Sequence, residues 1–188
     1  MNQTAISARR QRERLRQQLR PAAVRLLFIG ESPPASGRFF YRRDSGLYRA
    51  IREAFQMIDP SITDPTFLTV FQESGCYLFD LCPQPVDRLL ATARRDACRL
   101  AEGNLSRVID RLQPNMIATL LRSIESNVVA SIAMAHWRGS VLHLPYPGRW
   151  KRHREAFVRE LLPAIRPIVL SRTASRVDQS PPTQRTAL

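Results

Sequence analysis

Short apolar segments alternate with longer amphipathic segments along the chain. The apolar segments cover residues 24–30, 75–83, 116–121 and 140–144, and each is followed by a polar residue or a proline. Runs of this length indicate buried strands, because a strand covered on both faces needs apolar side chains at most positions. We therefore expect four strands in a mostly parallel sheet.

The segments between these strands have the spacing of helices. In residues 45–58 the apolar side chains recur on one helical face, and Asp44 or Ser45 can cap the helix. Further helices are predicted over residues 66–72, 91–112, 123–136 and 152–165. Strands that alternate with helices predict an α/β fold, here a three-layer α/β/α sandwich around a central four-stranded sheet.

The two ends of the chain differ from this core. Residues 1–20 are polar and rich in arginine, which predicts a basic helix or arm on the surface. Residues 21–167 contain all the predicted strands and form the α/β domain. Residues 168–188 carry few large apolar side chains, so we predict a disordered tail.

The charge is strongly positive, at +13 for a chain of 188 residues. Of its 29 basic residues all except Lys151 are arginine. GC-rich coding by itself explains a preference for arginine over lysine, but it does not explain the net excess of positive charge. The excess makes a polyanion such as nucleic acid a serious candidate partner.

The composition also limits location and cofactors. No apolar run approaches the roughly 20 residues of a membrane helix, and the N-terminus has no apolar signal segment. The three cysteines, Cys76, Cys82 and Cys98, are neither paired nor spaced as CxxC. We therefore expect a reducing, cytoplasmic location, at the nucleoid if the protein binds DNA, with no membrane partner. We also expect no metal and no cofactor, because scattered thiols do not form a four-cysteine site.

Unusual residues follow three of the four predicted strands. These segments are Gly30–Pro34 (GESPP), Asp80–Pro83 (DLCP) and His143–Gly148 (HLPYPG). In an open α/β sheet, sites lie outside the carboxyl ends of the strands, so these loops should converge on one edge. GESPP is not a phosphate-binding P-loop, because it lacks the Lys-Ser/Thr pair and its prolines have no N–H.

Each of these residues also has an ordinary structural interpretation. Glu31 could be a solvated loop carboxylate, and Asp80 could cap a turn. His143 could be a structural histidine at a strand end. The aromatic residues that follow GESPP could belong to the core. The combination is more informative than any one residue.

Together the three strand-end motifs resemble those of the uracil-DNA glycosylase superfamily, over about Val24 to Ile165. GESPP is similar to the first motif of that family, Gly-x-x-Pro. Glu31 falls where the Gly-Glu-x-Pro branches carry an acid, and Ser32 falls where other branches carry Asp or Asn. LPYPG is similar to the last motif, typically His-Pro-Ser-Pro.

The resemblance implies roles for further residues. Phe39, Phe40 or Tyr41 would stack on the base extruded from DNA. Asp80 lies where the family carries the residue, usually Asn, that reads the edge of uracil. An aspartate accepts hydrogen bonds unless it is protonated, so this position differs from the family pattern.

The last motif departs from the family at its histidine. If Pro145 and Pro147 align with the two prolines of His-Pro-Ser-Pro, Leu144 takes the histidine position. His143 stands one residue earlier, which in a strand places it on the opposite face. It could reach the site only if the turn shifts.

The function implied is that of a DNA glycosylase-like protein, which hydrolyses the N-glycosidic bond of a damaged or deaminated base flipped out of single-stranded or lesion-containing DNA. Stacking on an aromatic ring returns about 1–3 kcal/mol per base. Glu31 would stabilise the sugar cation and position water, and His143 would face the base anion. The residues expected to hold the DNA backbone are Arg42, Arg43, Arg149, Lys151 and Arg152.

Two alternatives remain open at this point. The chain could be a non-catalytic protein of the same fold that binds nucleic acid, a nucleobase or a nucleotide. It could also be a hydrolase that acts on a different small molecule.

Overall fold

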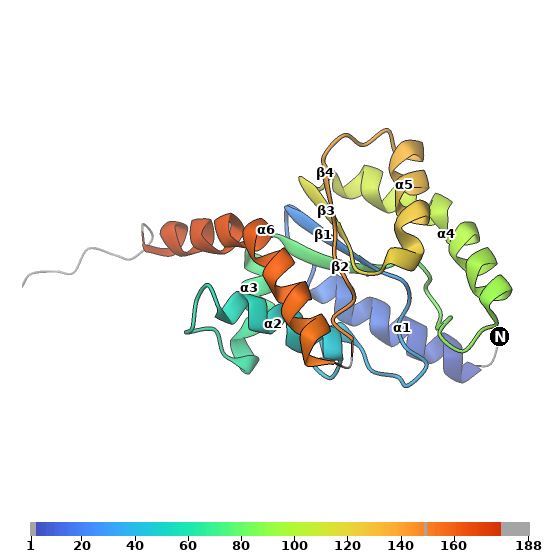
Figure 1. Cartoon of the computed structure of the whole chain (residues 1–188), viewed down its shortest axis with the longest axis horizontal. Helices are drawn as coiled ribbons and strands as arrows, with labels where there is room; N and C mark the ends of the chain where they lie inside the picture. Colours follow the sequence, from blue (N-terminus) through green and yellow to red (C-terminus); the bar gives the residue numbers. More distant parts are fainter. Residues whose placement is uncertain (1–2, 149, 178–188) are drawn as a thin grey trace, which may run out of the picture.

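A single four-stranded sheet lies at the centre of the protein (Figure 1). The computed structural model describes residues 3–148 and 150–177. The strands are β1 (Leu26–Gly30), β2 (Cys76–Asp80), β3 (Met116–Thr119) and β4 (Ser140–His143), in the order β2-β1-β3-β4. Every pair is parallel, which confirms the predicted α/β fold.

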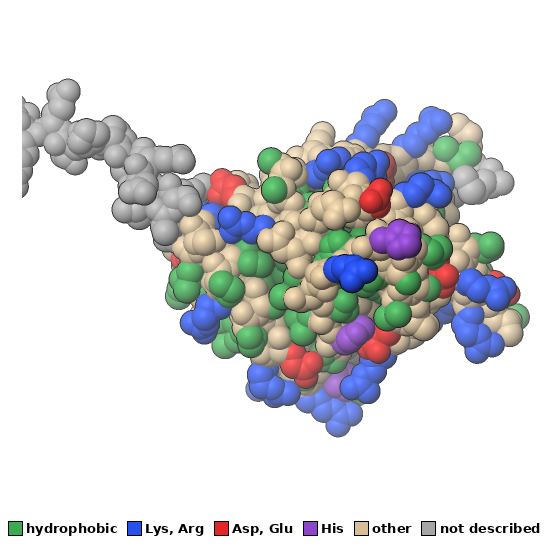
Figure 2. Space-filling model, turned by 90° about the horizontal axis from the view of Figure 1, so that it is seen from above, with side chains coloured by type: hydrophobic (Ala, Val, Ile, Leu, Met, Phe, Trp, Pro, Cys, Tyr) green, Lys and Arg blue, Asp and Glu red, His purple; other side chains and the backbone are tan. Residues whose placement is uncertain are grey.

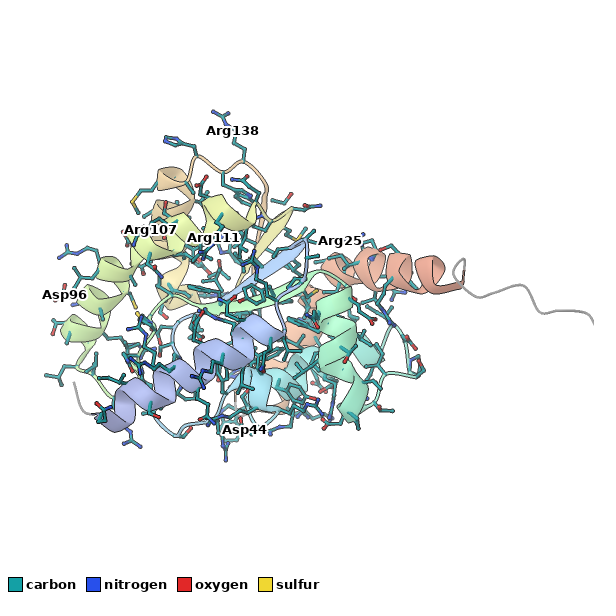
Figure 3. All side chains as sticks on the ribbon, turned by 180° about the vertical axis from the view of Figure 1, so that it is seen from behind. Arg25, Asp44, Asp96, Arg107, Arg111 and Arg138 are labelled. Carbon is teal, nitrogen blue, oxygen red and sulfur yellow. The ribbon has the colours of Figure 1, made fainter. Side chains whose placement is uncertain are left out.

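Helices cover both faces of this sheet. The 3-10 turn η1 (Phe40–Arg42) follows β1 and precedes α2 (Gly46–Gln56) and α3 (Asp64–Glu73). The last helix, α6 (Lys151–Val177), packs against α2 and covers the same face of the sheet as α2 and α3. The turn η2 (Arg122–Ile124) leads into α5 (Glu125–Met134), which packs against α4 (Ala91–Leu112). The first helix, α1 (Gln3–Gln18), lies on the same side of the sheet as α4 (Figure 3).

The strand register shows why two layers form. Phe28 of β1 stacks on Phe71 of α3, with ring centroids 5.7 Å apart. Phe79 of β2 is level with Ile29, the next residue of β1, so it points to the opposite face. There the Arg16 guanidinium of α1 lies 4.0 Å from the centre of the Phe79 ring. The central strand β1 and its neighbour β2 therefore bury side chains on both faces, whereas β4, at the edge of the sheet, is exposed at three of its four residues.

The core on the α2 and α3 side is largely aromatic. Phe40 makes edge or tilted ring contacts with Tyr48, Phe67 and Phe71. Tyr41 is bound to the edge strand β2: its hydroxyl accepts a hydrogen bond from the Leu78 N–H at 2.8 Å and donates one to the Leu78 carbonyl at 3.2 Å. The burial of Tyr41 raises the pKa of its phenol well above the ordinary value. This segment therefore fastens the chain after β1 to the sheet.

The last helix is longer than predicted. The expected helix ends at residue 165, but α6 continues to Val177 through Pro163 and Pro167. The predicted disordered tail is therefore wrong for residues 168–177, and residues 178–188 lie outside the described part. Tertiary contacts extend the helix: Val169 is fully buried, and Arg172 pairs with Asp59 and Glu73.

The basic N-terminal segment forms the predicted helix and is docked on the domain. Its Leu15 and Leu19 pack against the core. The Arg12 guanidinium donates a hydrogen bond to the Pro83 carbonyl at 3.3 Å. No helix in the described ranges is long and apolar enough to cross a membrane.

Candidate functional site

A cavity of about 380 Å³ opens at the carboxyl edge of the sheet, and we call it the edge cavity. It is lined by the loop from Gly30 to Pro34, by Asp80 at the end of β2, by Leu120 and Leu121 after β3, and by Tyr146 after β4. The expected convergence of the strand-end loops is therefore confirmed. The volume lies within the range of small-molecule sites.

Glu31 forms one wall of the edge cavity and is paired with an arginine. Only 7% of Glu31 is exposed. The Arg94 Nε lies 2.7 Å from Glu31 Oε1, and Nη2 lies 2.5 Å from Oε2. This is a bidentate, charge-assisted pair between α4 and the end of β1, and hydrogen bonding to Glu31 raises the pKa of Arg94. Each carboxylate oxygen of Glu31 therefore accepts one hydrogen bond from Arg94.

Asp80 has a different environment at the other side of the same cavity. Burial raises the pKa of its carboxyl to about 6, and the positive charges of Arg16 and Arg12 oppose that rise only in part. None of the described residues donates a hydrogen bond to this carboxylate. Asp80 therefore changes charge near pH 6, and its protonated form can donate a hydrogen bond.

Gly30 makes room for this carboxyl group. A Cβ added to Gly30 would lie 2.6 Å from Asp80 Oδ1, well inside van der Waals contact. Glycine in the first motif thus allows the Asp80 side chain to lie across the end of β1. The first and second strand-end motifs are therefore coupled by packing.

Phe39 is the aromatic residue best placed to stack on a ligand. It lines the edge cavity, is 5% exposed, and its N–H donates to Asp44 Oδ1 at 2.6 Å. Phe40 also lines the cavity, but its ring is held in the aromatic core. Tyr41 is not among the cavity-lining residues, and its hydroxyl is bonded to β2. The structure thus does not bring Tyr41 to the site.

Two side chains shape the rim of the cavity by holding its loops. Ser32 Oγ accepts a hydrogen bond from the Val86 N–H at 3.2 Å. Asp87 accepts the Ala35 N–H, with its carboxylate oxygens at 3.0 and 3.2 Å. These bonds tie the loop after β1 to the loop after β2, so Ser32 has a positioning role in this structure.

His143 lies away from the edge cavity. It is exposed at the end of β4, and its Nδ1 is 3.7 Å from Glu125 Oε1 on α5. Figure 2 shows histidine side chains on the molecular surface. Leu144 is 1% exposed, and its N–H donates to the Thr119 carbonyl, which extends the pairing of β3 and β4. Because the turn does not shift, the structure does not place His143 with Glu31, and the predicted catalytic pairing of these two residues is not formed.

Of the residues predicted to hold the DNA backbone, those that the structure describes lie outside the edge cavity, and Arg42 and Lys151 contact other side chains of the protein. Arg42 donates to Gln11 Oε1 at 2.5 Å and to the Gly37 carbonyl at 3.2 Å. Lys151 pairs with Glu155 one turn along α6, at 3.4 Å. Arg43 and Arg152 are exposed, and Arg149 lies outside the described residues. None of the four described residues lines the edge cavity.

No sequence motif pointed to Arg94, which stands 63 residues from Glu31 along the chain. Arg94 and its neighbours form an ordinary basic helix surface in the sequence. Asp87 likewise belongs to no motif that would have marked it as a residue of the cavity rim. By contrast, Tyr146 belongs to the LPYPG motif and could have been chosen as a lining residue from that motif.

The described residues contain no group of three or more His, Cys, Asp or Glu side chains that could hold a metal ion. Cys82 and Cys98 lie with their Sγ atoms 3.7 Å apart as free thiols, and burial raises the pKa of Cys82 to about 12. The side chains that line the edge cavity provide carboxyl groups, two arginines, serine hydroxyls and aromatic rings.

No protein-family model matches the chain, and no curated protein matches its sequence. The resemblance to uracil-DNA glycosylases thus remains a prediction based on the motifs and is consistent with the α/β fold.

Proposed function

We propose that the chain is a uracil-DNA glycosylase-like protein that takes an extruded nucleobase into the edge cavity and hydrolyses its N-glycosidic bond. The observation that carries the proposal is Asp80, a carboxyl group with a pKa of about 6 in the same cavity as Glu31 and Phe39. A carboxyl that titrates near neutral pH is suited to acid catalysis.

The roles follow from the charges that develop in the reaction. When the bond between the sugar and the base breaks, its electron pair goes to the base and positive charge remains on the sugar. Protonated Asp80 donates its proton to the departing base, a role that His143 does not fill because it lies away from the cavity. The Glu31 carboxylate stabilises the sugar cation. A water molecule then adds to the sugar carbon, and the proton that it loses goes to the Asp80 carboxylate, which restores the starting state. Phe39 stacks on the base.

A second function is favoured by one specific contact. Arg94 already pairs with both oxygens of Glu31, so the negative charge that would stabilise a sugar cation has a partner within the protein. In that case the edge cavity recognises a nucleobase or nucleotide without cleaving it. The same residues serve as the binding site in both functions.

A strand-cleavage assay separates the two. Wild-type protein would be incubated with single- and double-stranded DNA that carries uracil, hypoxanthine or xanthine, and abasic sites would then be cleaved with alkali. We expect product from the wild type and at least a hundredfold less from Asp80→Asn or Glu31→Gln, the scale of general acid–base catalysis.

Asp96→Asn is the matched control, because Asp96 is an exposed carboxylate on α4 that pairs only weakly with Arg99, at 3.6 Å. It should cleave as the wild type does. Binding without product on every substrate would reject catalysis in favour of the binding function, and full activity in Asp80→Asn would reject the role of Asp80.

A further inference from the structure

A second cavity, of about 230 Å³, lies between α1 and α4 and is lined by arginines. We call it the arginine cleft; its guanidinium groups come from Arg9, Arg12 and Arg16 of α1 and from Arg111 of α4. Figure 3 shows α1 and α4 from this side of the molecule, with Arg107 and Arg111 labelled on α4. The strand-end motifs contribute Pro33, Asp80 and Pro83 to its lining, but no motif pointed to the four arginines.

Positive charge exceeds negative charge around the cleft. Two carboxylates, Glu13 and Asp80, line it beside the four guanidinium groups. Glu13 is already engaged, since it pairs with Arg16 and accepts a hydrogen bond from Gln17 at 2.7 Å. The clustering of cations is unfavourable without an anion, and a bound anion would relieve this repulsion.

The effect of crowding positive charges in the cleft is seen most directly in the pKa of Arg12. Burial lowers the pKa of its guanidinium, the negative charge of Asp80 acts against this, and the positive charges of Arg42 and Arg9 lower it further. The guanidinium donates to a backbone carbonyl, that of Pro83, and remains close to the cleft. A planar guanidinium with spare donors is well suited to bind phosphate.

The cleft adjoins the edge cavity. Pro33, Phe39 and Asp80 line both spaces. A base stacked on Phe39 in the edge cavity would therefore have the arginine cleft directly beside it.

We propose that the arginine cleft binds a phosphodiester group of the nucleic-acid strand whose base occupies the edge cavity. This proposal rests on the proposed function, because it takes a nucleobase as the occupant of the edge cavity. The same chemistry could come from the phosphate of a free nucleotide, and the experiment distinguishes the two sources.

The test compares Arg111→Gln with Arg107→Gln. Both arginines are exposed on α4, and Arg107 does not belong to the lining of the cleft, so the two variants change the net charge equally. Fluorescence anisotropy would measure binding of a single-stranded oligodeoxynucleotide with one deoxyuridine, at several salt concentrations. Circular dichroism melts would verify that both variants fold.

We expect Arg111→Gln to bind about tenfold more weakly, as for loss of one charge-assisted hydrogen bond. The slope of log affinity against log salt should fall by about 0.7 for each lost phosphate contact. Arg107→Gln should stay within about twofold of the wild type, because Arg107 is a solvent-exposed charge one turn away that does not line the cleft. Equal losses in the two variants would overturn the proposal. Arg12→Gln offers a second variant, which should also weaken binding.

Further ligands identify the source of the phosphate. An oligonucleotide with uncharged methylphosphonate linkages around the deoxyuridine should bind wild type and Arg111→Gln alike. If deoxyuridine monophosphate binds in an Arg111-dependent way and the oligonucleotide does not, the ligand is a free nucleotide and the strand assignment is overturned.

The proposal for the arginine cleft and the proposed function can be tested separately. Deoxyuridine, which has no phosphate, reports on the edge cavity alone, and its binding should not change in Arg111→Gln. Arg111-dependent oligonucleotide binding without base excision would reject catalysis and support the cleft. If the wild type excises the base and Arg111→Gln binds the oligonucleotide normally, the proposal for the arginine cleft is overturned and the proposed catalysis is supported.

Discussion

The ends of β1 and β2 carry one carboxylate each, and their neighbours give the two groups opposite properties. Glu31 after β1 is held on both oxygens by Arg94. Asp80 at the end of β2 is partly buried near Arg16 and Arg12, and its loss of hydration outweighs their charges, so its pKa rises to about 6. Direct hydrogen bonding preserves a charge that burial alone would suppress. One cavity therefore contains a paired anion and a group that can donate a proton.

The largest expected effect comes from breaking the pair at β1. Arg94→Met would leave the buried Glu31 carboxylate without its partner, at a cost of about 3–5 kcal/mol in the free energy of unfolding. Urea denaturation measures this loss. Arg95→Met is the control, because Arg95 is exposed on the same helix, and it should change stability by less than about 0.5 kcal/mol.

The double variant Glu31→Gln/Arg94→Met sharpens this prediction. With both charges removed, much of the lost stability should return, since no unpaired ion stays buried. A double variant as unstable as Arg94→Met alone would contradict the view that the pair exists to neutralise Glu31.

The next-largest effect concerns Asp80 at the end of β2. Here a substitution should increase the free energy of unfolding, whereas Arg94→Met should decrease it. The folded-state pKa of Asp80, about 6, lies above its ordinary value of 3.8, so the folded protein keeps this proton longer than the unfolded chain does. The ionised group therefore lowers stability progressively as the pH rises from about 4 to about 6, and the whole cost is present above that range.

Asp80→Asn should remove this cost. Two pH units correspond to about 3 kcal/mol, so we expect the variant to be about 2–3 kcal/mol more stable than wild type at pH 8 and little different near pH 4. Urea denaturation at the two pH values measures the difference. A pH-independent change in stability would be evidence against a raised pKa at this position, and Asp96→Asn serves as the exposed control.

The smallest effect concerns the charges that oppose burial at Asp80. Arg16 and Arg12 lower the Asp80 pKa, so replacing either with an uncharged residue should raise it above about 6. Arg16→Met keeps an apolar stem over the Phe79 ring while it removes the charge. Carbon NMR of the Asp80 carboxyl over a pH titration follows the shift. An unchanged or lower pKa would show that the arginines do not act on this group.

Much of the fold could be predicted because its signals are local. The helix at Ala91–Leu112 has the predicted bounds, and β2 ends at Asp80 as expected. The end of α6 could not be predicted, because Val169 and Arg172 extend the helix through contacts with the rest of the domain. Local composition favoured an earlier end, because few large apolar side chains follow in the C-terminal segment.

The candidate site likewise has one part that could be predicted from the sequence and one part that could not. The sequence by itself determined the alternation of strands and helices, and therefore which loops meet at the edge of the sheet, because the carboxyl ends of parallel strands share one edge. Only the tertiary structure decided what each side chain meets there. Arg94 reaches Glu31 across 63 residues, and the pairing of β4 with β3 leaves His143 with Glu125. Such contacts depend on packing between distant segments, and no local pattern of residues encodes them.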